Sequence, residues 1–425
     1  MSAPAVPTGK ITWLDRWLVR HMLRLAGQPR LAVELWNGER LTASSARNDS
    51  TAPIGTVQID SRRCLLRLLT DPELHFGEEW SDGHVDIDGD LTEVLCELNR
   101  SLESTARRRN HPWRWPRLRR PGSAQAARHN IHHHYDLGND FYRLWLDEQL
   151  LYTCAYFDQP PMSLEAAQIA KMDHVCRKLR LQPGERVIEA GSGWGALALH
   201  MARRYGVTVR SYNIAHEQVV ESQRLAHKAG LTSQVEFIED DWRNITGSCD
   251  AFVSVGMLEH VRPENYPHLG RMIDGCLPRH GRGLIHTIGL NTPRPLDRWT
   301  ERYIFPGAQP PALSQMTELF EPYGFSILDV ENLRLHYAET LRHWLARFEQ
   351  SADRIRDMFD KRFVRMWRLY LAASVATFET GWLQLFQVVF ARGASNDVPW
   401  TRSHLYADAR RLSSTAGESQ SVRSQ

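Results

Sequence analysis

The chain has 425 residues, long enough for two or three domains, and its composition of 42% apolar and 24% charged residues with a net charge of +2 is ordinary for a soluble protein. No run of about eighteen apolar residues and no signal-peptide region occur, which argues against a membrane-spanning or secreted chain and predicts a cytoplasmic location. The six cysteines form no Cys-x-x-Cys pair, so we expect neither disulfides nor a zinc site.

Residues 11–26 have the pattern of a basic amphipathic helix. Its apolar positions are Ile11, Leu14, Leu18 and Met22, and its arginines are Arg16, Arg20 and Arg24. A helix of this kind lies on a membrane surface or packs against its own domain, and packing is the commoner outcome. The sequence leaves both open.

The following residues predict the rest of a small α+β domain that spans residues 1–105. Short strands are expected within residues 31–60, with Asn37-Gly38 as a hairpin turn. Helical patterns cover residues 61–69 and 91–102, and we expect the polar, glycine-bearing stretch at residues 77–83 to separate them. This region contains no catalytic constellation.

Residues 106–128 predict a basic linker rich in Arg, Pro and Trp. Between Ser104 and Tyr135 there are eight arginines and no Asp or Glu, and three prolines forbid a long helix. Such a patch attracts polyanions, either nucleic acid or an anionic membrane surface, or is simply a solvated linker. A domain boundary is expected here.

The stretch Val187 to Gly195 predicts a ligand site. A turn signal at residues 182–185 precedes a buried-strand pattern at residues 186–190, and a helical pattern follows at residues 196–205. Glycines at positions 191, 193 and 195 allow a sharp turn and close approach of a ligand to the backbone. Strand, glycine turn and helix together predict a nucleoside-sized site.

The turn by itself leaves the ligand open between S-adenosylmethionine, a dinucleotide and no ligand at all. Its Gly-x-Gly-x-Gly spacing is shorter than the Gly-x-Gly-x-x-Gly of pyrophosphate-binding turns, and no Gly-Lys-Ser/Thr follows. Glu189 adds a carboxylate that suits an ammonium group and repels a pyrophosphate. These features favour S-adenosylmethionine.

From residue 129 the chain alternates between strand and helix patterns, which predicts a doubly wound parallel sheet. The predicted strands cover residues 186–190, 207–213, 235–239, 250–256, 283–289 and 325–330. Ligands in such sheets bind at the carboxyl ends of the strands. We therefore expect the residues that follow five of these strands to line one crevice.

The predicted doubly wound sheet and the segments after it form one domain at residues 129–410. The C-terminal part of this domain begins with a proline-bearing loop at residues 291–322. Two amphipathic helices are then expected between Glu339 and Trp382, the second with an apolar stripe that includes Ile355, Phe359, Phe363, Met366, Tyr370 and Phe378. Residues 384–392 predict a late strand, and residues 411–425 a disordered tail.

Taken together, these segments resemble the cyclopropane-fatty-acyl-phospholipid synthases and the related cyclopropane mycolic acid synthases. Seven runs occur in the family's order: His134 to Asp140, Tyr152 to Phe157, Gly191 to Gly195, Ser254 to Val261, His286 to Gly289, Tyr303 to Pro306 and Gln387 to Phe390. Residues 1–100 resemble the extra domain of the bacterial enzyme more loosely. The resemblance implies an α/β fold of the S-adenosylmethionine-dependent methyltransferase type, with a helical lid and a small N-terminal α+β domain.

The activity that the resemblance implies is methyl transfer from S-adenosylmethionine to the cis double bond of a phospholipid acyl chain. The alkene is a poor nucleophile and must be aligned with the methyl group in a dry site. Attack leaves a carbocation, which aromatic faces stabilise. Aromatic residues expected near the pocket are Tyr156, Phe157, Trp299, Tyr303 and Phe305.

Ring closure in the family uses a bicarbonate ion as the base. The residues that hold it correspond to Cys154, Glu259, His286, Ile288 and Tyr337 in this chain. An anion in an apolar pocket needs donors, which the His286 ring, the Tyr337 hydroxyl and the Ile288 amide offer, while Glu259 can accept the ion's hydroxyl hydrogen. Taken singly, each of these residues is more simply a structural one.

The resemblance also implies the residues that bind S-adenosylmethionine. They are Tyr152, Thr153, Glu189, Gly191, Gly193, Asn213, Ile214, Gln218, Asp241 and Trp242, with Trp242 stacked on the adenine or walling it off. The chain departs from the family at Ser192, at Asn213 to Ala215, where one hydroxyl is lost, and at Ser374, where some relatives have a cysteine assigned as catalytic. Without that thiol, base catalysis is favoured over covalent catalysis.

The expected partner is an unsaturated phospholipid at an anionic membrane surface, with the enzyme attached peripherally at the inner face. A branched-chain fatty acid product and a nucleic-acid methyltransferase are alternatives, although the motif of base methylation is absent and no nucleic-acid partner is expected. The sequence leaves a homodimer open. Successive residues seldom bind one ion, so the run His132-His133-His134 is not expected to bind a metal. We expect His134 and Tyr135 to belong to a segment that folds over the cofactor.

Overall fold

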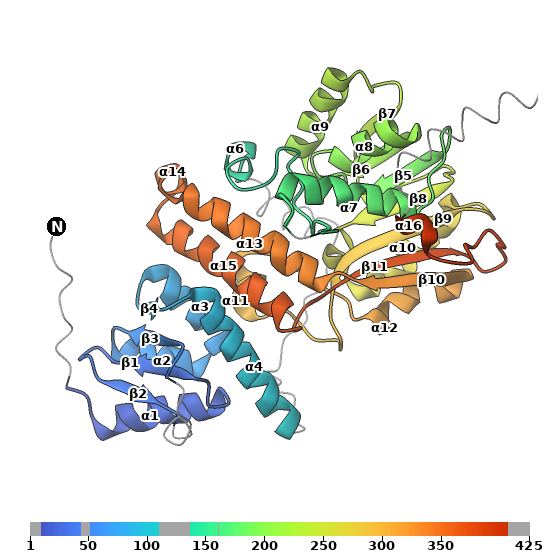
Figure 1. The fold of residues 1–425 in the computed structure, drawn as a ribbon. Helices are drawn as coiled ribbons and strands as arrows, with labels where there is room; N and C mark the ends of the chain where they lie inside the picture. The colour runs from blue at the N-terminus through green and yellow to red at the C-terminus, as the bar shows by residue number, and fades with distance from the viewer. Residues whose placement is uncertain (1–9, 44–51, 110–136, 160, 407–425) are drawn as a thin grey trace, which may run out of the picture.

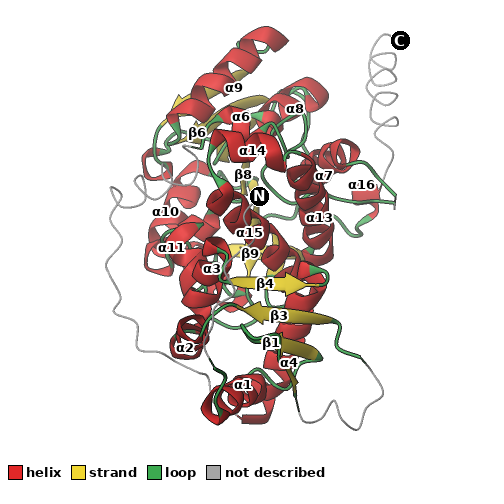
Figure 2. Ribbon diagram, turned by 90° about the vertical axis from the view of Figure 1, so that its left-hand side faces the viewer, coloured by secondary structure: helices red, strands yellow, loops and turns green. Residues whose placement is uncertain are grey.

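The computed structural model describes residues 10–43, 52–109, 137–159 and 161–406. They form two sheets, a four-stranded one near the N-terminus and a seven-stranded one in the remainder of the chain. Figure 2 shows the small sheet at one end of the molecule and helices α8 and α9 at the other. The predicted tail, the histidine run and most of the predicted basic linker lie outside the described residues.

The N-terminal region is the α+β unit that the sequence predicted. It comprises α1 (Trp13–Leu25), β1 (Leu31–Glu34), β2 (Arg40–Thr42), β3 (Gly55–Ile59), α2 (Arg62–Thr70), α3 (Pro72–Asp82), β4 (Val85–Asp88) and α4 (Leu91–Arg109). The strand order is β2-β1-β3-β4, with β1 and β3 parallel. The predicted hairpin is confirmed, since β1 pairs antiparallel with β2 and Gly38 adopts a φ of +83° in the turn.

The buried face of α1 differs from the predicted one. Asp15, Val19 and Leu23 are buried, whereas Leu14 is exposed. The reason is a tertiary ion pair, because the Asp15 carboxylate caps the helix through Thr12 and accepts hydrogen bonds from the Arg62 guanidinium at 2.6 Å. The sequence pattern by itself gives no sign that Asp15 faces inward.

Residues 77–83 were wrongly predicted to separate two helices, because most of them belong to α3. Gly77 is required there by packing, since a Cβ atom would lie 2.4 Å from the Trp299 ring. Glu78 and Glu79 both form ion pairs with Arg67 of α2. The last helix, α4, ends at Arg109, beyond the predicted domain boundary at residue 105.

The large sheet has the order β10-β11-β9-β8-β5-β6-β7. Its strands are β5 (Arg186–Ala190), β6 (Thr208–Asn213), β7 (Val235–Glu239), β8 (Ala251–Val255), β9 (Arg282–Gly289), β10 (Phe325–Asn332) and β11 (Gln384–Arg392). Strand β11 pairs antiparallel with both of its neighbours, β10 and β9, and all the other neighbouring strands of this sheet pair in parallel. The predicted doubly wound, mostly parallel sheet is therefore confirmed.

Helices cover both faces of this sheet. On one face pack α7 (Leu164–Lys178), α8 (Ala196–Tyr205) and α9 (His216–Ala229), and on the other α10 (Tyr266–Cys276) and α12 (Leu313–Met316). Short helices also occur at α6 (Asn139–Tyr142), α11 (Arg298–Tyr303) and α16 (Ser403–Tyr406), with 3₁₀ turns η2 (Trp242–Asn244), η3 (Leu258–His260), η4 (Pro263–Asn265), η5 (Thr317–Leu319) and η6 (Glu321–Tyr323). The stretch predicted as a loop at residues 291–322 thus contains helical turns.

Three helices, α13 (Arg334–Gln350), α14 (Ala352–Met358) and α15 (Lys361–Glu379), take the place of the two that were predicted. The break comes at Asp360, whose carboxylate accepts a hydrogen bond from the Phe363 amide at 2.6 Å and starts a new helix. Figure 1 shows α13 and α15 between the small sheet and the large one. One hydrophobic cluster runs from Val19 in α1 to Trp367 in α15, so both parts share a core.

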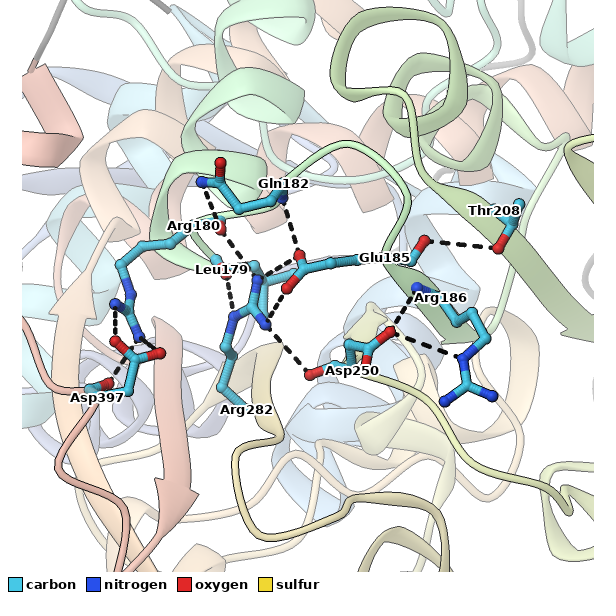
Figure 3. A network of polar contacts seen from close by, with 9 residues as sticks. All are labelled: Leu179, Arg180, Gln182, Glu185, Arg186, Thr208, Asp250, Arg282 and Asp397. Carbon is cyan, nitrogen blue, oxygen red and sulfur yellow. Dashed lines mark hydrogen bonds and ion pairs between the residues drawn. The ribbon is translucent and has the colours of Figure 1, made fainter. Parts of the chain in front are cut away.

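A polar network holds the amino ends of the large sheet's strands (Figure 3). Arg282 at the start of β9 is buried and forms a bidentate pair with Glu185 at 2.8 and 2.6 Å. The same guanidinium donates to the carbonyls of Leu179, Arg180 and Asp250. These contacts fix the sheet at the edge opposite the predicted crevice.

Candidate active site

The glycine turn after β5 is built for two different kinds of close contact. Gly191, Gly193 and Gly195 have φ values of +94°, +52° and +86°, which favour glycine. A Cβ on Gly195 would lie 2.6 Å from the Phe237 ring, whereas no described atom lies within 4 Å of a Cβ on Gly193. Gly195 therefore serves packing, and Gly193 leaves backbone open to a ligand.

The residues after β6 hold this turn in place. The Asn213 side-chain amide donates to the Gly193 carbonyl at 3.2 Å and to the Gln218 side chain at 2.9 Å. The Asn213 side-chain oxygen accepts from the Ala215 amide. Ile214, between them, is half-buried. The predicted cofactor residues Gly193, Asn213 and Gln218 thus form one hydrogen-bonded unit at the carboxyl ends of β5 and β6.

Asp241 and Trp242 follow β7 along the same edge of the sheet. The Asp241 carboxylate is buried and accepts hydrogen bonds from the Arg243 amide and guanidinium at 2.8 to 3.0 Å. That guanidinium lies 4.6 Å from the centre of the Trp242 ring. Arg243 therefore orients both predicted residues, a role that the sequence analysis did not assign.

Helix α7 supports the predicted cofactor residues Tyr152 and Thr153. The Gln168 side chain donates to the Thr153 carbonyl at 2.9 Å, and the Lys171 ammonium donates to the Thr153 hydroxyl at 2.9 Å. The Tyr152 hydroxyl lies 2.7 Å from that of Tyr370 in α15. The segment that carries Tyr152 and Thr153 thus connects α7 with the lid helices.

Lys171 is a buried cation that the sequence analysis missed. It lies beneath the site, and two buried carboxylates, Asp147 and Glu189, favour its charge; burial lowers its pKa to about 8. Burial also raises the pKa of Glu189 to about 7, although the Ser211 hydroxyl donates to its carboxylate at 2.5 Å. The available signal was a lysine four residues from both Ala167 and Val175, on the apolar face of its helix.

Glu259 lies in η3, directly after β8, and meets the end of β9. One of its carboxylate oxygens accepts a hydrogen bond from the Ile288 amide at 2.6 Å, and the other is buried without a protein hydrogen-bond partner. Burial raises the pKa of Glu259 to about 7. The hydroxyl of Tyr266, near enough to feel the Glu259 charge, is also buried without a protein partner.

His286 precedes Ile288 by two residues in β9, so both side chains point to the same face of the sheet. The Gln387 side-chain amide of β11 lies 3.0 Å from His286 Nδ1, and since an amide nitrogen can only donate, Nδ1 accepts. Burial lowers the pKa of His286 well below its usual value. The neutral ring therefore carries its proton on Nε2.

Cys154 and Tyr337 reach this region from two further segments. The Cys154 thiol lies 3.9 Å from the Leu333 carbonyl, and the Tyr337 amide donates to that same carbonyl at 3.1 Å. The Leu333 amide in turn donates to Leu385 of β11, which pairs with Ile288. Burial raises the pKa of the Cys154 thiol, which keeps it protonated. The structure thus brings all five predicted catalytic residues to one part of the molecule.

Aromatic rings surround this region, but not always those expected from the sequence. Phe305 packs against Tyr370 with ring centres 5.7 Å apart. Trp299 and Tyr303 turn toward the N-terminal unit, where the Tyr303 hydroxyl donates to Glu78 at 2.7 Å. Tyr156 and Phe157 stack on histidine rings. The rings packed around Tyr152 are Tyr142, Trp145 and Trp344.

No group of three or more His, Cys, Asp or Glu side chains that could hold a metal ion occurs in the described part of the chain. The histidine run at residues 132–134 lies outside that part, and so does Tyr135, which was expected with His134 to belong to a segment that folds over the cofactor. Ser374, which replaces the cysteine of some relatives, is half-buried in α15.

Comparison with known proteins identifies the architecture. Residues 123–388 match the family model described as mycolic acid cyclopropane synthetase. The chain belongs to this family. It is 40% identical to the cyclopropane-fatty-acyl-phospholipid synthase of Escherichia coli over 62% of the chain and 68% of that protein. It is 33% identical to a probable fatty acid methyltransferase of Pseudomonas putida over 88% of the chain and 96% of that protein.

The fold agrees with solved members of the family. The structure of mycolic acid cyclopropane synthase CmaA1 complexed with SAH and CTAB superposes with a TM-score of 0.59 at 29% identity, over 62% of this chain and 97% of that one. This member of the cyclopropane synthetase family is therefore an S-adenosylmethionine-dependent methyltransferase that acts on a lipid. Within its described residues, no helix has the length and apolar character needed to cross a bilayer.

Proposed function

We propose that this enzyme transfers the methyl group of S-adenosylmethionine to the cis double bond of unsaturated phospholipid acyl chains and closes a cyclopropane ring. The observation that carries the proposal is the buried Glu259 carboxylate, one oxygen of which accepts from the Ile288 amide while the other lacks a protein partner. A buried polar atom left without a partner marks a site that binds a polar group.

The glycine turn fits S-adenosylmethionine. The open backbone at Gly193, the side chains of Asn213 and Gln218, and the pair Asp241 and Trp242 would hold it, with Tyr152 and Thr153 on the opposite wall. When bound, S-adenosylmethionine supplies an electrophilic methyl group on a positively charged sulfur. Arg243 keeps Asp241 and Trp242 in place, and Lys171 keeps Thr153 in place.

The chemistry begins at the acyl double bond. Its π electrons form a bond to the methyl carbon as the carbon–sulfur bond breaks, which leaves a carbocation on the acyl chain. Ring faces near Tyr152 and Phe305 favour such a cation by about 2 kcal/mol or more when water is excluded. A proton must then leave the former methyl group, and the electrons of its C–H bond close the ring.

The polar cluster fits a bicarbonate ion. His286 would offer its Nε2 proton to such an ion, and the oxygen of Glu259 that lacks a protein partner would accept the ion's hydroxyl hydrogen. Cys154 and Tyr337 would approach the ion from the lid side, where both contact the Leu333 carbonyl. When bound, bicarbonate supplies a base that is not itself part of the chain. The buried Lys171 adds a positive charge on the side of Cys154 and His286.

The proposed substrate implies an enzyme attached peripherally at the cytoplasmic face of a membrane, with a phospholipid rather than nucleic acid as its partner. The name of the Escherichia coli relative, a cyclopropane-fatty-acyl-phospholipid synthase, supports this substrate. An acyl double bond lies deep in a bilayer. The acyl chain of the lipid must therefore leave the membrane to reach a site enclosed by α13 and α15.

The test is product analysis with methyl-deuterated S-adenosylmethionine and vesicles of a cis-monounsaturated phospholipid. Ring closure removes one deuteron, so the saturated ring product should retain a CD₂ group. The rate should fall when dissolved carbon dioxide is removed and recover when bicarbonate is restored. Unlabelled lipid would refute the proposed reaction, and labelled ring product without any dependence on bicarbonate would refute the assigned base.

A second candidate is methyl transfer that ends in a branched fatty acyl chain. The similarity to the probable fatty acid methyltransferase of Pseudomonas putida, which spans 96% of that protein, favours it. The same experiment separates the two. A methylene-branched product also keeps two deuterons, but it has a double bond that hydrogenation removes. A methyl-branched product in which the cation loses a proton of the acyl chain keeps all three deuterons together with a double bond.

A further inference from the structure

Helix α1 lies at the end of the molecule opposite α9 (Figures 1 and 2) and has a fixed inner face. Val19 and Leu23 are buried in the core, Asp15 pairs with Arg62, and Arg16 pairs with Glu39 at 2.6 Å. These contacts involve residues of the N-terminal unit alone. The orientation of α1 is therefore set without any contribution from the catalytic region.

The outer face of α1 exposes large apolar side chains. Trp13 is 74% exposed, Trp17 47% and Leu14 46%. Trp13 and Trp17 lie four residues apart and so share a side of the helix, and the Trp17 ring stacks on His21 at 5.2 Å. Two indole rings displayed together on a globular surface mark an interaction site rather than scattered exposure.

The charge of this face has one sign. Arg20 and Arg24 are exposed and continue the stripe that Trp13 and Trp17 begin. Among the described residues neither arginine forms an ion pair with a carboxylate, and the sole acidic residue of α1, Asp15, is buried. The outer face thus presents indoles and guanidinium groups, and Glu39, whose carboxylate lies within electrostatic reach of Arg20, is already paired with Arg16.

We propose that this outer face, formed by Trp13, Leu14, Trp17, Arg20 and Arg24, docks the enzyme on an anionic lipid bilayer. Indole rings prefer the headgroup level, where an apolar body meets a wet rim, and arginines bind anionic headgroups from the same depth. The helix lies parallel to the surface because its inner face stays bound to the protein. This docking surface goes beyond the proposed function, on which it rests for the choice of a lipid partner.

Vesicle binding by the full-length enzyme tests the proposal. With vesicles of phosphatidylglycerol and phosphatidylcholine, the Trp13→Ala/Trp17→Ala variant should bind at least about tenfold more weakly than the wild type. The matched control is Trp400→Ala, since Trp400 is 101% exposed elsewhere on the molecule, and it should bind as the wild type does. Equal vesicle affinity of the double variant and the wild type would overturn the proposal.

The arginines provide an independent arm. Arg20→Gln/Arg24→Gln should weaken binding to the anionic vesicles by about tenfold, lower its salt dependence, and leave binding to pure phosphatidylcholine unchanged. Arg203→Gln/Arg204→Gln, on the exposed side of α8, is the control. A control that weakens binding as much as the α1 pair would show a general charge effect and overturn the assignment to α1.

Activity separates this proposal from the proposed function. Both α1 variants should convert detergent-dispersed phospholipid at the wild-type rate and vesicle phospholipid more slowly. Wild-type activity on vesicles by both variants would remove the docking role and leave the reaction standing, whereas inactivity of the wild type would remove the reaction. A change from dimer to monomer in sedimentation, with unchanged vesicle binding, would assign the surface to a second copy of the chain instead.

Discussion

The two ends of the large sheet hold similar residues for different purposes. At the amino end, the charge of Arg282 is matched by Glu185 and by three carbonyl groups (Figure 3). At the carboxyl end, Glu259 and Tyr266 each keep a buried oxygen without a protein partner. Buried polar atoms are normally satisfied within the protein, so the difference shows which end is built for stability and which for binding.

The same contrast appears in the electrostatics. The pKa of Glu259 is raised to about 7 by burial, and the pKa of His286 is lowered well below its usual value, so both groups are poised close to or in their neutral forms at neutral pH. Perturbed groups of this kind cluster where a protein handles protons or binds ions. At the amino end, by contrast, Arg282, Arg186 and Arg180 each pair with a carboxylate.

Arg282→Met should produce the largest effect on stability. It removes the buried guanidinium that pairs with the partly buried Glu185 and donates to three carbonyls, which is expected to lower the free energy of unfolding by about 3–5 kcal/mol. Urea denaturation measures it, with Arg402→Met as a control at an exposed ion pair, expected to cost under about 1 kcal/mol. Activity per folded molecule should not change; a loss of activity in the folded fraction would contradict the division between the two ends.

Glu259→Gln should, in contrast to Arg282→Met, lower activity rather than the free energy of unfolding. The assigned role in holding the base predicts a loss of ring product of at least about a hundredfold. Initial rates with vesicle phospholipid and labelled S-adenosylmethionine measure this loss. Retention of more than about a tenth of the wild-type rate would be incompatible with the role assigned to Glu259.

The stability of this variant should depend on pH in a defined direction. Because folding raises the pKa of Glu259 from 4.5 to about 7, the ionised carboxyl destabilises the wild type increasingly as pH rises between these values. Glutamine removes this penalty, so the variant should be more stable than the wild type by up to about 3 kcal/mol at pH 8 and equal to it near pH 4. Thermal unfolding across this range measures the difference, and a destabilised variant at pH 8 would contradict the assignment.

Two glycines in one turn offer a finer comparison. Gly195→Ala forces a methyl group against Phe237 and Ser222, so it should lower the free energy of unfolding by about 2–4 kcal/mol. Gly193→Ala meets no described atom and should cost about 1 kcal/mol in stability, yet weaken S-adenosylmethionine binding by about tenfold or more. Calorimetric titration and thermal unfolding separate the two, and equal losses of affinity would show that Gly193 has no special role.

Lys171→Met should have the smallest effect on binding. It removes the donor to Thr153 and the cation that favours ionised Asp147 and Glu189, which should weaken S-adenosylmethionine binding by about tenfold. Lys178→Met is the matched control, because Lys178 is buried on the same helix but pairs with Glu331 away from Thr153. Both variants should lose stability, and only Lys171→Met should lose affinity.

Local patterns in the sequence determined much of the fold. The strand at residues 384–392 and the helix at residues 196–205 were predicted with the bounds that the structure has, because short apolar runs and a flanking glycine specify them without distant partners. The site residues were located by resemblance. For those that follow five of the strands, the alternation of strand and helix had already predicted that they meet at one edge of the sheet.

Tertiary structure decided what depends on partners far away in the chain. Asp15 faces inward because its carboxylate pairs with Arg62. Position 77 holds a glycine because the Trp299 ring packs against it. Lys171 is buried because Thr153 accepts its hydrogen bond and two carboxylates favour its charge. The hydrophobic periodicity of a sequence reflects the average environment of a helix or strand, so it does not predict a single ion pair or a single close aromatic contact between distant residues. The tertiary structure also decides which oxygen of Glu259 lacks a protein partner, because the amide of Ile288, which is distant in the sequence, occupies the other oxygen.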